Sequence, residues 1–139
     1  MYWLFYSSDT NKLSKEIVTR FQKLFGLSGM NVQYGFKKLD GFLSRPHKNI
    51  THAVFMVSAQ NDLSALTRYQ DQIWNWCTII GIPEARRDKM MSSALEFHPR
   101  FVAMLPEDTG HFWAVVEKMI QNDRKKSIGT SVKRRGRQN

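Results

Sequence analysis

The chain has 139 residues, 42% of them hydrophobic and 12% aromatic, which is enough for one domain with a real core and excludes disorder over its whole length. A single cysteine, Cys77, excludes an intramolecular disulfide and a zinc site of clustered thiolates. No apolar run reaches the length of a membrane span, so we expect no membrane partner.

The formal net charge of +9 is concentrated at one end of the sequence. Seven of the 21 Lys and Arg lie between Arg124 and Arg137 with no acid among them, which leaves 14 bases against all 12 acids in the rest. We therefore predict a near-neutral globular domain over residues 1–123 and a basic flexible tail over residues 124–139. Such a tail is typical of proteins with a polyanion partner. The alternative is a solvated end with no specific partner.

The first third of the chain predicts strand, helix and strand. Trp3–Ser7 is aromatic, aliphatic and uncharged, as in a central strand. From Lys12 to Phe25 the apolar residues follow helical spacing, with most of the charges on the other face. The stretch 32–37 alternates between apolar and polar residues and predicts a half-buried strand. The stretch 40–49, with its glycine, proline and basic residues, is predicted to be a loop.

The remaining elements alternate more regularly. Thr51–Ser58 predicts a strongly buried strand, and a helix follows from Asn61 or Asp62. A strand is predicted around Trp76–Ile80, then a helix that begins at Pro83 and carries Leu95 on its apolar face. A short strand over 101–105 and a last helix from about 106 to Asp123 complete the order β-α-β-β-α-β-α-β-α.

Two early strands without a helix between them argue against a purely parallel, doubly wound sheet. The predicted fold class is therefore α+β, with a mainly antiparallel central sheet of about five strands and helices on both faces.

Signals for catalysis and for metal binding are weak. The four histidines show no ligand spacing with one another or with carboxylates, so we expect no metal site. Ser7, Ser8 and Ser58 lie at strand ends, but no sequence signature pairs them with His and Asp. We expect no enzyme activity and no cofactor. The turn Ser7–Lys12 offers a possible phosphate cradle at a helix N-terminus, although an ordinary capping turn is the simpler interpretation.

The order of several short motifs resembles the origin-binding domain of polyomavirus large T antigens, a family of viral replication initiators. Leu4–Ser8 is similar to the family's first core strand, and His52–Ser58 to its apolar strand before a DNA-reading loop. Two Ser-Ala segments, Ser64–Leu66 followed by Tyr69 and Ser93–Leu95 followed by Pro99 and Phe101, match two helix ends in order and spacing.

The resemblance implies a central antiparallel sheet and sequence-specific binding of duplex DNA at origin repeats, with self-association on the DNA. An early viral protein of the host nucleus is implied, and Lys133–Arg137 also resembles a nuclear-localisation cluster; otherwise the protein is expected in the cytoplasm. The implied DNA-reading loop maps onto Ala59–Asp62. In it Gln60 and Asn61 have side chains that can read adenine in the major groove.

The candidate DNA contacts fall in three groups. They are Ser58, Gln60 and Asn61 in the reading loop, Arg45, His47 and Lys48 in the basic loop before the third strand, and Lys125, Lys126, Lys133, Arg134, Arg135 and Arg137 in the tail. The family's loop is rich in Arg and His, whereas this one has neither and contains Asp62. Two other hypotheses stay open: a protein-interaction module whose tail alone contacts nucleic acid, and a nucleotide- or phosphate-binding domain that uses the Ser7–Lys12 turn.

Overall fold

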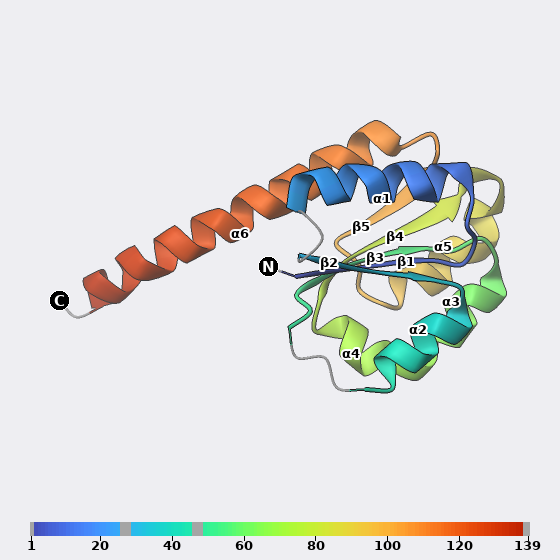
Figure 1. Ribbon diagram of the computed structural model, residues 1–139, viewed down its shortest axis with the longest axis horizontal. Coiled ribbons are helices and arrows are strands. Elements are labelled where there is room, and N and C mark those ends of the chain that lie inside the picture. The colour runs from blue at the N-terminus through green and yellow to red at the C-terminus, as the bar shows by residue number, and fades with distance from the viewer. Residues whose placement is uncertain (1, 26–28, 46–48, 138–139) are drawn as a thin grey trace.

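The computed structural model describes residues 2–25, 29–45 and 49–137, with side chains up to Asp123. Strands and helices alternate along the whole chain (Figure 1). The strands are β1 (Trp3–Ser7), β2 (Met30–Tyr34), β3 (His52–Met56), β4 (Cys77–Pro83) and β5 (Phe101–Leu105). The α-helices are α1 (Lys12–Phe25), α2 (Phe36–Leu43), α3 (Gln60–Leu66), α4 (Gln70–Trp74), α5 (Arg87–Leu95) and α6 (Thr109–Arg137), and two 3-10 turns are η1 (Thr67–Tyr69) and η2 (Glu84–Arg86).

The five strands form one sheet in the order β2-β1-β3-β4-β5, and every neighbouring pair is parallel. In register, Phe5 of β1 lies opposite Val32 of β2 on one side and Val54 of β3 on the other. The predicted mainly antiparallel sheet is therefore wrong, and with it the sheet that the origin-binding resemblance implies. The observed order is the flavodoxin-like order of doubly wound α/β folds.

The error arose at α2, an eight-residue helix in the stretch that we predicted to be strand end and loop. Gly35 precedes this helix with φ of 82°, a conformation that other residues rarely adopt, and so turns the chain from β2 into α2. With α2 present, a helix lies between each pair of consecutive strands. Such crossovers return the chain to the same end of the sheet, which makes the strands parallel.

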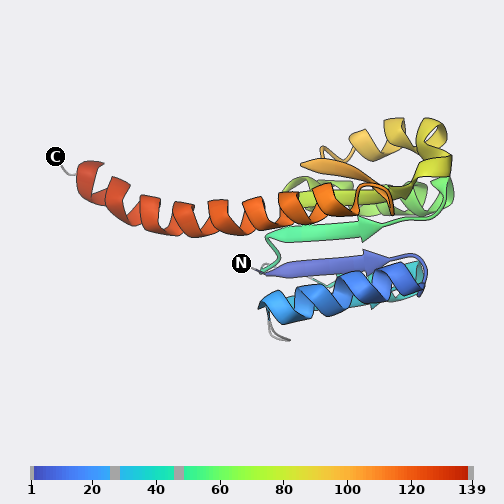
Figure 2. The same cartoon turned by 90° about the horizontal axis from the view of Figure 1, so that it is seen from above.

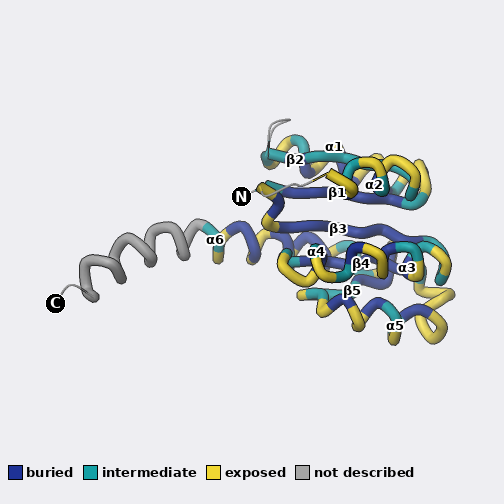
Figure 3. The backbone as a smooth tube through the Cα atoms, turned by 90° about the horizontal axis from the view of Figure 1, so that it is seen from below, coloured by how far each residue is buried: buried dark blue, intermediate teal, exposed yellow. Residues whose placement is uncertain are grey.

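Each face of the sheet is covered by its own helices (Figures 1 and 2). Helices α1 and α6 cover one face, where Phe5, Phe21 and Phe112 are fully buried. Helices α2 to α5 cover the other face, where Tyr6 and Phe55 are buried. The alternation of side chains along each central strand supplies both cores, and for this reason β1 and β3 are buried at every position (Figure 3).

The fourth strand and the helix after it differ from the predictions. Pro83 is the last residue of β4 rather than the start of a helix, and Leu95 of α5 is exposed rather than part of the core. The last helix, α6, has 29 residues, and its backbone continues past Asp123 and past the amino end of the sheet to Arg137 (Figure 1). The division into a domain over residues 1–123 and a basic flexible tail stays a prediction. Within the described residues, none of the helices combines the length and apolar character that a membrane span requires.

Candidate functional site

The strand order reverses between β1 and β3, and in doubly wound folds this reversal is where ligands bind, outside the carboxyl ends of the strands. The segments after these two strands are Ser8–Asn11 and Val57–Ala59. They lie side by side because Ser8 N donates to Met56 O at 2.9 Å. We call the polar residues of these two segments the switch-point cluster; they are Ser8, Asp9, Asn11 and Ser58, with Ser7 and Asp62 beside them.

The side chains of the switch-point cluster bond to one another. Ser58 Oγ donates to Asp9 Oδ2 at 2.5 Å, and Ser8 Oγ lies 3.0 Å from Ser58 Oγ. Asp62 Oδ2 accepts from the backbone N–H groups of Ser58 and Ala59, both at 3.0 Å. Ser58, a predicted DNA contact, is thus held inside this network.

The start of α1 is capped by Asn11, whose Oδ1 accepts from Ser14 N at 2.8 Å. Ser14 Oγ donates back to the Asn11 carbonyl at 2.9 Å, and Ser7 Oγ donates to the Asp9 carbonyl at 2.6 Å. These contacts fit the capping turn that we considered the simpler interpretation of Ser7–Lys12. The carboxylates of Asp9 and Asp62 beside this turn would repel a phosphate group.

The cavity at the cluster is small, with a volume of about 80 Å³, and both polar residues such as Ser58 and apolar residues such as Met56 line it. Leu105 closes it over Gly81, where an added Cβ would lie only 2.7 Å from Leu105 Cδ1. In the part of the chain that the structure describes, no group of three or more His, Cys, Asp or Glu could hold a metal ion. The cavity cannot take a nucleotide without rearrangement, because drug-sized ligands occupy roughly 300 Å³ or more.

Two polar groups near this end of the sheet are buried without a hydrogen-bond partner among the described residues, Tyr6 Oη and Gln60 Oε1. Burial, followed by the charges of Asp62 and Asp9, raises the pKa of Tyr6 to about 12. Gln60 Nε2 donates to Ser93 Oγ at 2.7 Å and so ties α3 to α5. The side chain that we predicted to read adenine is therefore engaged inside the protein.

The other predicted DNA contacts are not brought together. Gln60 and Asn61 form the first turn of α3 at the carboxyl end of the sheet, and only Asn61 is exposed. Arg45 follows α2 at the opposite, amino end, and His47 and Lys48 lie outside the described residues. The predicted tail contacts belong to the backbone of α6, which leaves the body at that same amino end (Figure 1).

The two helical layers differ in charge, which the sequence alone did not reveal. Helices α1 and α6 contain twelve Lys and Arg against Glu16, Glu117 and Asp123. All other residues together contain nine Lys and Arg and nine Asp and Glu. The entire formal net charge of +9 thus belongs to these two helices, which we call the basic layer. Seven of the positive charges lie beyond Asp123, where α6 continues past the sheet (Figure 1).

On the basic layer, the exposed face of α1 lines an open groove of about 640 Å³. The groove is lined by Lys12, Lys15, Glu16, Thr19, Arg20 and Lys23. The Arg20 guanidinium lies over the Trp113 ring of α6, with Cζ 4.3 Å from the ring centroid. These cations are exposed to solvent and can receive an anion.

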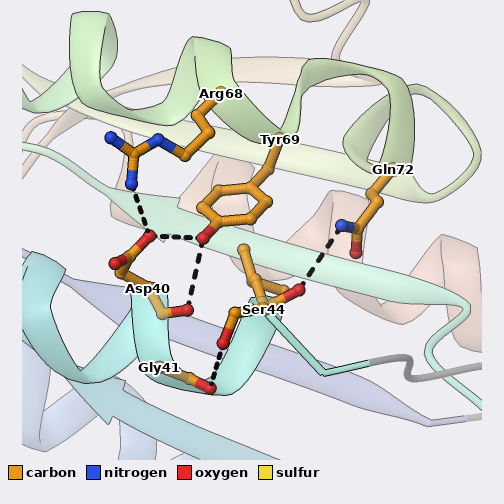
Figure 4. A network of polar contacts seen from close by, with 7 residues as sticks. Asp40, Gly41, Ser44, Arg68, Tyr69 and Gln72 are labelled. Carbon is orange, nitrogen blue, oxygen red and sulfur yellow. Dashed lines mark hydrogen bonds and ion pairs between the residues drawn. The ribbon is translucent and has the colours of Figure 1, made fainter.

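Cations on the opposite layer are more closely matched by acids. Arg68 Nη1 lies 3.1 Å from Asp40 Oδ1, and Tyr69 donates a hydrogen bond to the same carboxylate (Figure 4). Gln72 Nε2 donates to the Leu43 carbonyl at 3.4 Å, which completes the connection between α2 and the η1–α4 segment (Figure 4). The hydrogen bond from Tyr69 lowers the pKa of the Asp40 carboxyl, and the charge of Arg68 adds to this.

No protein-family model, curated protein or solved structure matches the chain.

Proposed function

We propose that the protein binds the phosphate backbone of a nucleic-acid duplex through the basic layer, without a chemical step. The observation that carries this proposal is the placement of all of the net charge on α1 and α6 while the rest of the molecule is neutral. Lys and Arg that neutralise phosphates release counterions, and this supplies most of the affinity of sequence-independent binding.

A duplex suits this layer better than a single strand. Single-strand binders stack bases on exposed aromatic side chains. On the basic layer Phe21, Phe112 and Trp113 are buried and Phe25 is half-buried, while residues 124–139 contain no aromatic residue. The layer therefore offers cations without a stacking platform, which favours contacts to the backbone of a stacked helix.

The proposed partner is a nucleic-acid duplex, as in the hypothesis from the sequence, but the proposed interface is the basic layer instead of the loop Ala59–Asp62. Of the three predicted groups of contacts, the tail residues lie on α6 and so belong to the basic layer. The reading loop is replaced by the exposed face of α1, because Gln60 is bonded to Ser93 and Ser58 to Asp9. We accordingly expect little discrimination among duplex sequences.

The test is fluorescence anisotropy of the full chain with a labelled mixed-sequence DNA duplex over a salt series. The variant Lys15→Gln/Lys23→Gln removes two exposed cations of α1, and Lys37→Gln/Lys38→Gln removes two exposed cations of α2 on the other layer. A plot of the logarithm of the association constant against the logarithm of the salt concentration has a negative slope. We expect this slope to become about 1.8 less negative in the α1 double variant and to stay near its original value in the α2 double variant.

The proposal fails if the unaltered chain does not bind the duplex at low salt, or if the two double variants lose affinity equally. A large preference for one duplex over scrambled competitors would return the reading function to Asn61 and the α3 turn.

A further inference from the structure

Arg20 lies against a buried aromatic ring of the basic layer. Its guanidinium lies over Trp113, whose exposed fraction is 6%, and the Trp113 ring packs against Phe21 and Phe112 at centroid distances of 5.1 and 5.0 Å. A cation–π contact at an exposed site contributes about 0.5 to 1 kcal/mol, so it biases the guanidinium toward the ring before any ligand arrives. Less ordering is then required when a ligand binds, which favours affinity.

Within the described residues no acceptor lies within hydrogen-bond distance of the Arg20 guanidinium, so its donors can meet an external acceptor. The closest carboxylate oxygen, Glu117 Oε1, is 3.9 Å from Nη2, beyond hydrogen-bond distance, and the Arg20 side chain is 53% exposed. Arg68 on the other layer differs, because its Nη1 lies 3.1 Å from Asp40 Oδ1. The Trp113 ring favours this position of the Arg20 guanidinium, and about half of the side chain stays exposed to solvent.

The neighbours of Arg20 suit an anion that carries repeated charges. Lys12, Lys15 and Lys23 line the same groove, with Glu16 as the acid among them. At a rise of about 1.5 Å per residue, the first and last of these lysines are separated by roughly 16 Å along α1. A ligand along this face meets several cations in sequence, with Arg20 between the lysines.

Resting on the proposed function, we propose that Arg20 makes the bidentate phosphate contact of the basic layer, while the lysines act as point charges. The two non-bridging oxygens of a phosphodiester match the planar fork of a guanidinium, and an ammonium group cannot reproduce this geometry. Trp113 is the positioning residue that presents the fork. Arg20 and Lys are therefore not interchangeable at this position, although both carry one positive charge.

The experiment compares Arg20→Lys with Arg87→Lys in the full chain. Arg87 is an exposed arginine at the start of α5 on the other layer. With a mixed-sequence DNA duplex as probe, Arg20→Lys should lower the affinity about tenfold, the order expected for hydrogen bonds to a charged group. Its salt slope should stay unchanged, because the charge is kept. Arg87→Lys should bind as the unaltered chain does.

A second pair of variants distinguishes whether Arg20 binds the phosphate or only packs α1 against α6. Glu117→Gln removes the acid closest to Arg20, and Glu96→Gln makes the same charge change on the other layer. We expect Glu117→Gln to tighten duplex binding several-fold more than Glu96→Gln, since Arg20 then faces phosphate alone. Thermal unfolding of each variant shows whether an affinity change accompanies a loss of stability.

Equal affinity of Arg20→Lys and the unaltered chain overturns the assignment of Arg20, and the proposed function then stands on charge alone. A second outcome also overturns the assignment: Arg20→Lys lowers the affinity tenfold, but Glu117→Gln and Glu96→Gln change the affinity equally. Arg20 would then act only through packing. Absence of duplex binding by the unaltered chain removes the proposed function itself.

Discussion

The variant Phe21→Ala tests whether an aromatic cluster holds the basic layer on the sheet. Phe21 of α1 is fully buried, with an exposed fraction of 0%. Its ring centroid lies 5.1 to 6.4 Å from those of Trp3, Phe5, Phe25, Phe112 and Trp113, which belong to α1, β1 and α6. Burial of a Phe ring of this kind stabilises a fold by about 3 to 5 kcal/mol relative to Ala.

The ring contacts place Phe21→Ala inside that range rather than below it, since each aromatic pair adds about 0.5 to 1.5 kcal/mol beyond its buried area. We expect a loss of about 4 kcal/mol in the free energy of unfolding and a fall in Tm of about 10 to 20 °C. Urea unfolding followed by circular dichroism measures the first quantity, and thermal unfolding measures the second.

The matched control is Leu24→Ala on the same helix, where the side chain is 47% exposed. This change should alter the free energy of unfolding by no more than about 0.5 kcal/mol. A loss below about 1.5 kcal/mol for Phe21→Ala, or losses of similar size in both variants, would refute the role of the cluster.

Three further predictions concern the sheet and the opposite layer. Tyr6→Phe removes a buried hydroxyl that lacks a partner among the described residues, so the free energy of unfolding should rise by about 1 to 2 kcal/mol in urea titration. Because folding raises the pKa of Tyr6 from 10.0 to about 12, the unaltered protein should lose stability as the pH rises through this window, and the variant should lose less. Gly81→Ala places a Cβ 2.7 Å from Leu105 Cδ1 and should destabilise by about 1 to 3 kcal/mol; a smaller loss in combination with Leu105→Ala than on its own would identify the clash. Folding lowers the pKa of the Asp40 carboxyl, so the stabilisation by this group is present above its unfolded pKa and is lost as the pH falls through the folded pKa. Asp40→Asn should therefore be less stable than the unaltered chain near pH 7 and similar to it near pH 2. Equal differences in stability at the two pH values would contradict this.

The strands could be predicted because their sequences are unusual in themselves. Trp3–Ser7 and His52–Met56 are apolar at nearly every position, which is typical of strands covered on both faces. The helix Lys12–Phe25 was predicted with the observed bounds, since its apolar spacing and its charged face agree. These features are local, so a single sequence is sufficient to recognise them.

The topology could not be predicted because it depended on one short helix. In α2 only Leu39 and Leu43 are buried, and Gly41 lies inside the helix, so the helical pattern is weak. The preceding alternation of apolar residues continued through Phe36 and predicted a longer strand. Without this helix two strands become neighbours in sequence, and the predicted sheet becomes antiparallel. One missed element therefore changed the fold class.

The interface depends on information that the linear sequence does not contain. The cations of α1 and those after Asp123 are about a hundred residues apart, and contacts such as the packing of Trp113 against Phe21 show that the two helices that carry them are neighbours. The engagement of Gln60 is equally non-local, because its partner Ser93 lies on another helix. The basic C-terminal end could be recognised in the sequence, whereas the proximity of the α1 cations to α6 could be recognised only in the fold.

The distribution of charge gives the basic layer a direction. At the carboxyl end of the sheet, acids such as Asp9 and Asp62 stand beside cations such as Lys12, whereas residues 124–137 of α6, which continues past the amino end, contain seven Lys and Arg and no acid. A long polyanion is therefore attracted most strongly along α1 toward the amino end. Doubly wound folds commonly bind ligands at the carboxyl end, but the fold alone does not determine function. Here the hydroxyls at that end bond to one another and the charge lies elsewhere, so the helical layer is the surface on which binding of a polyanion is expected.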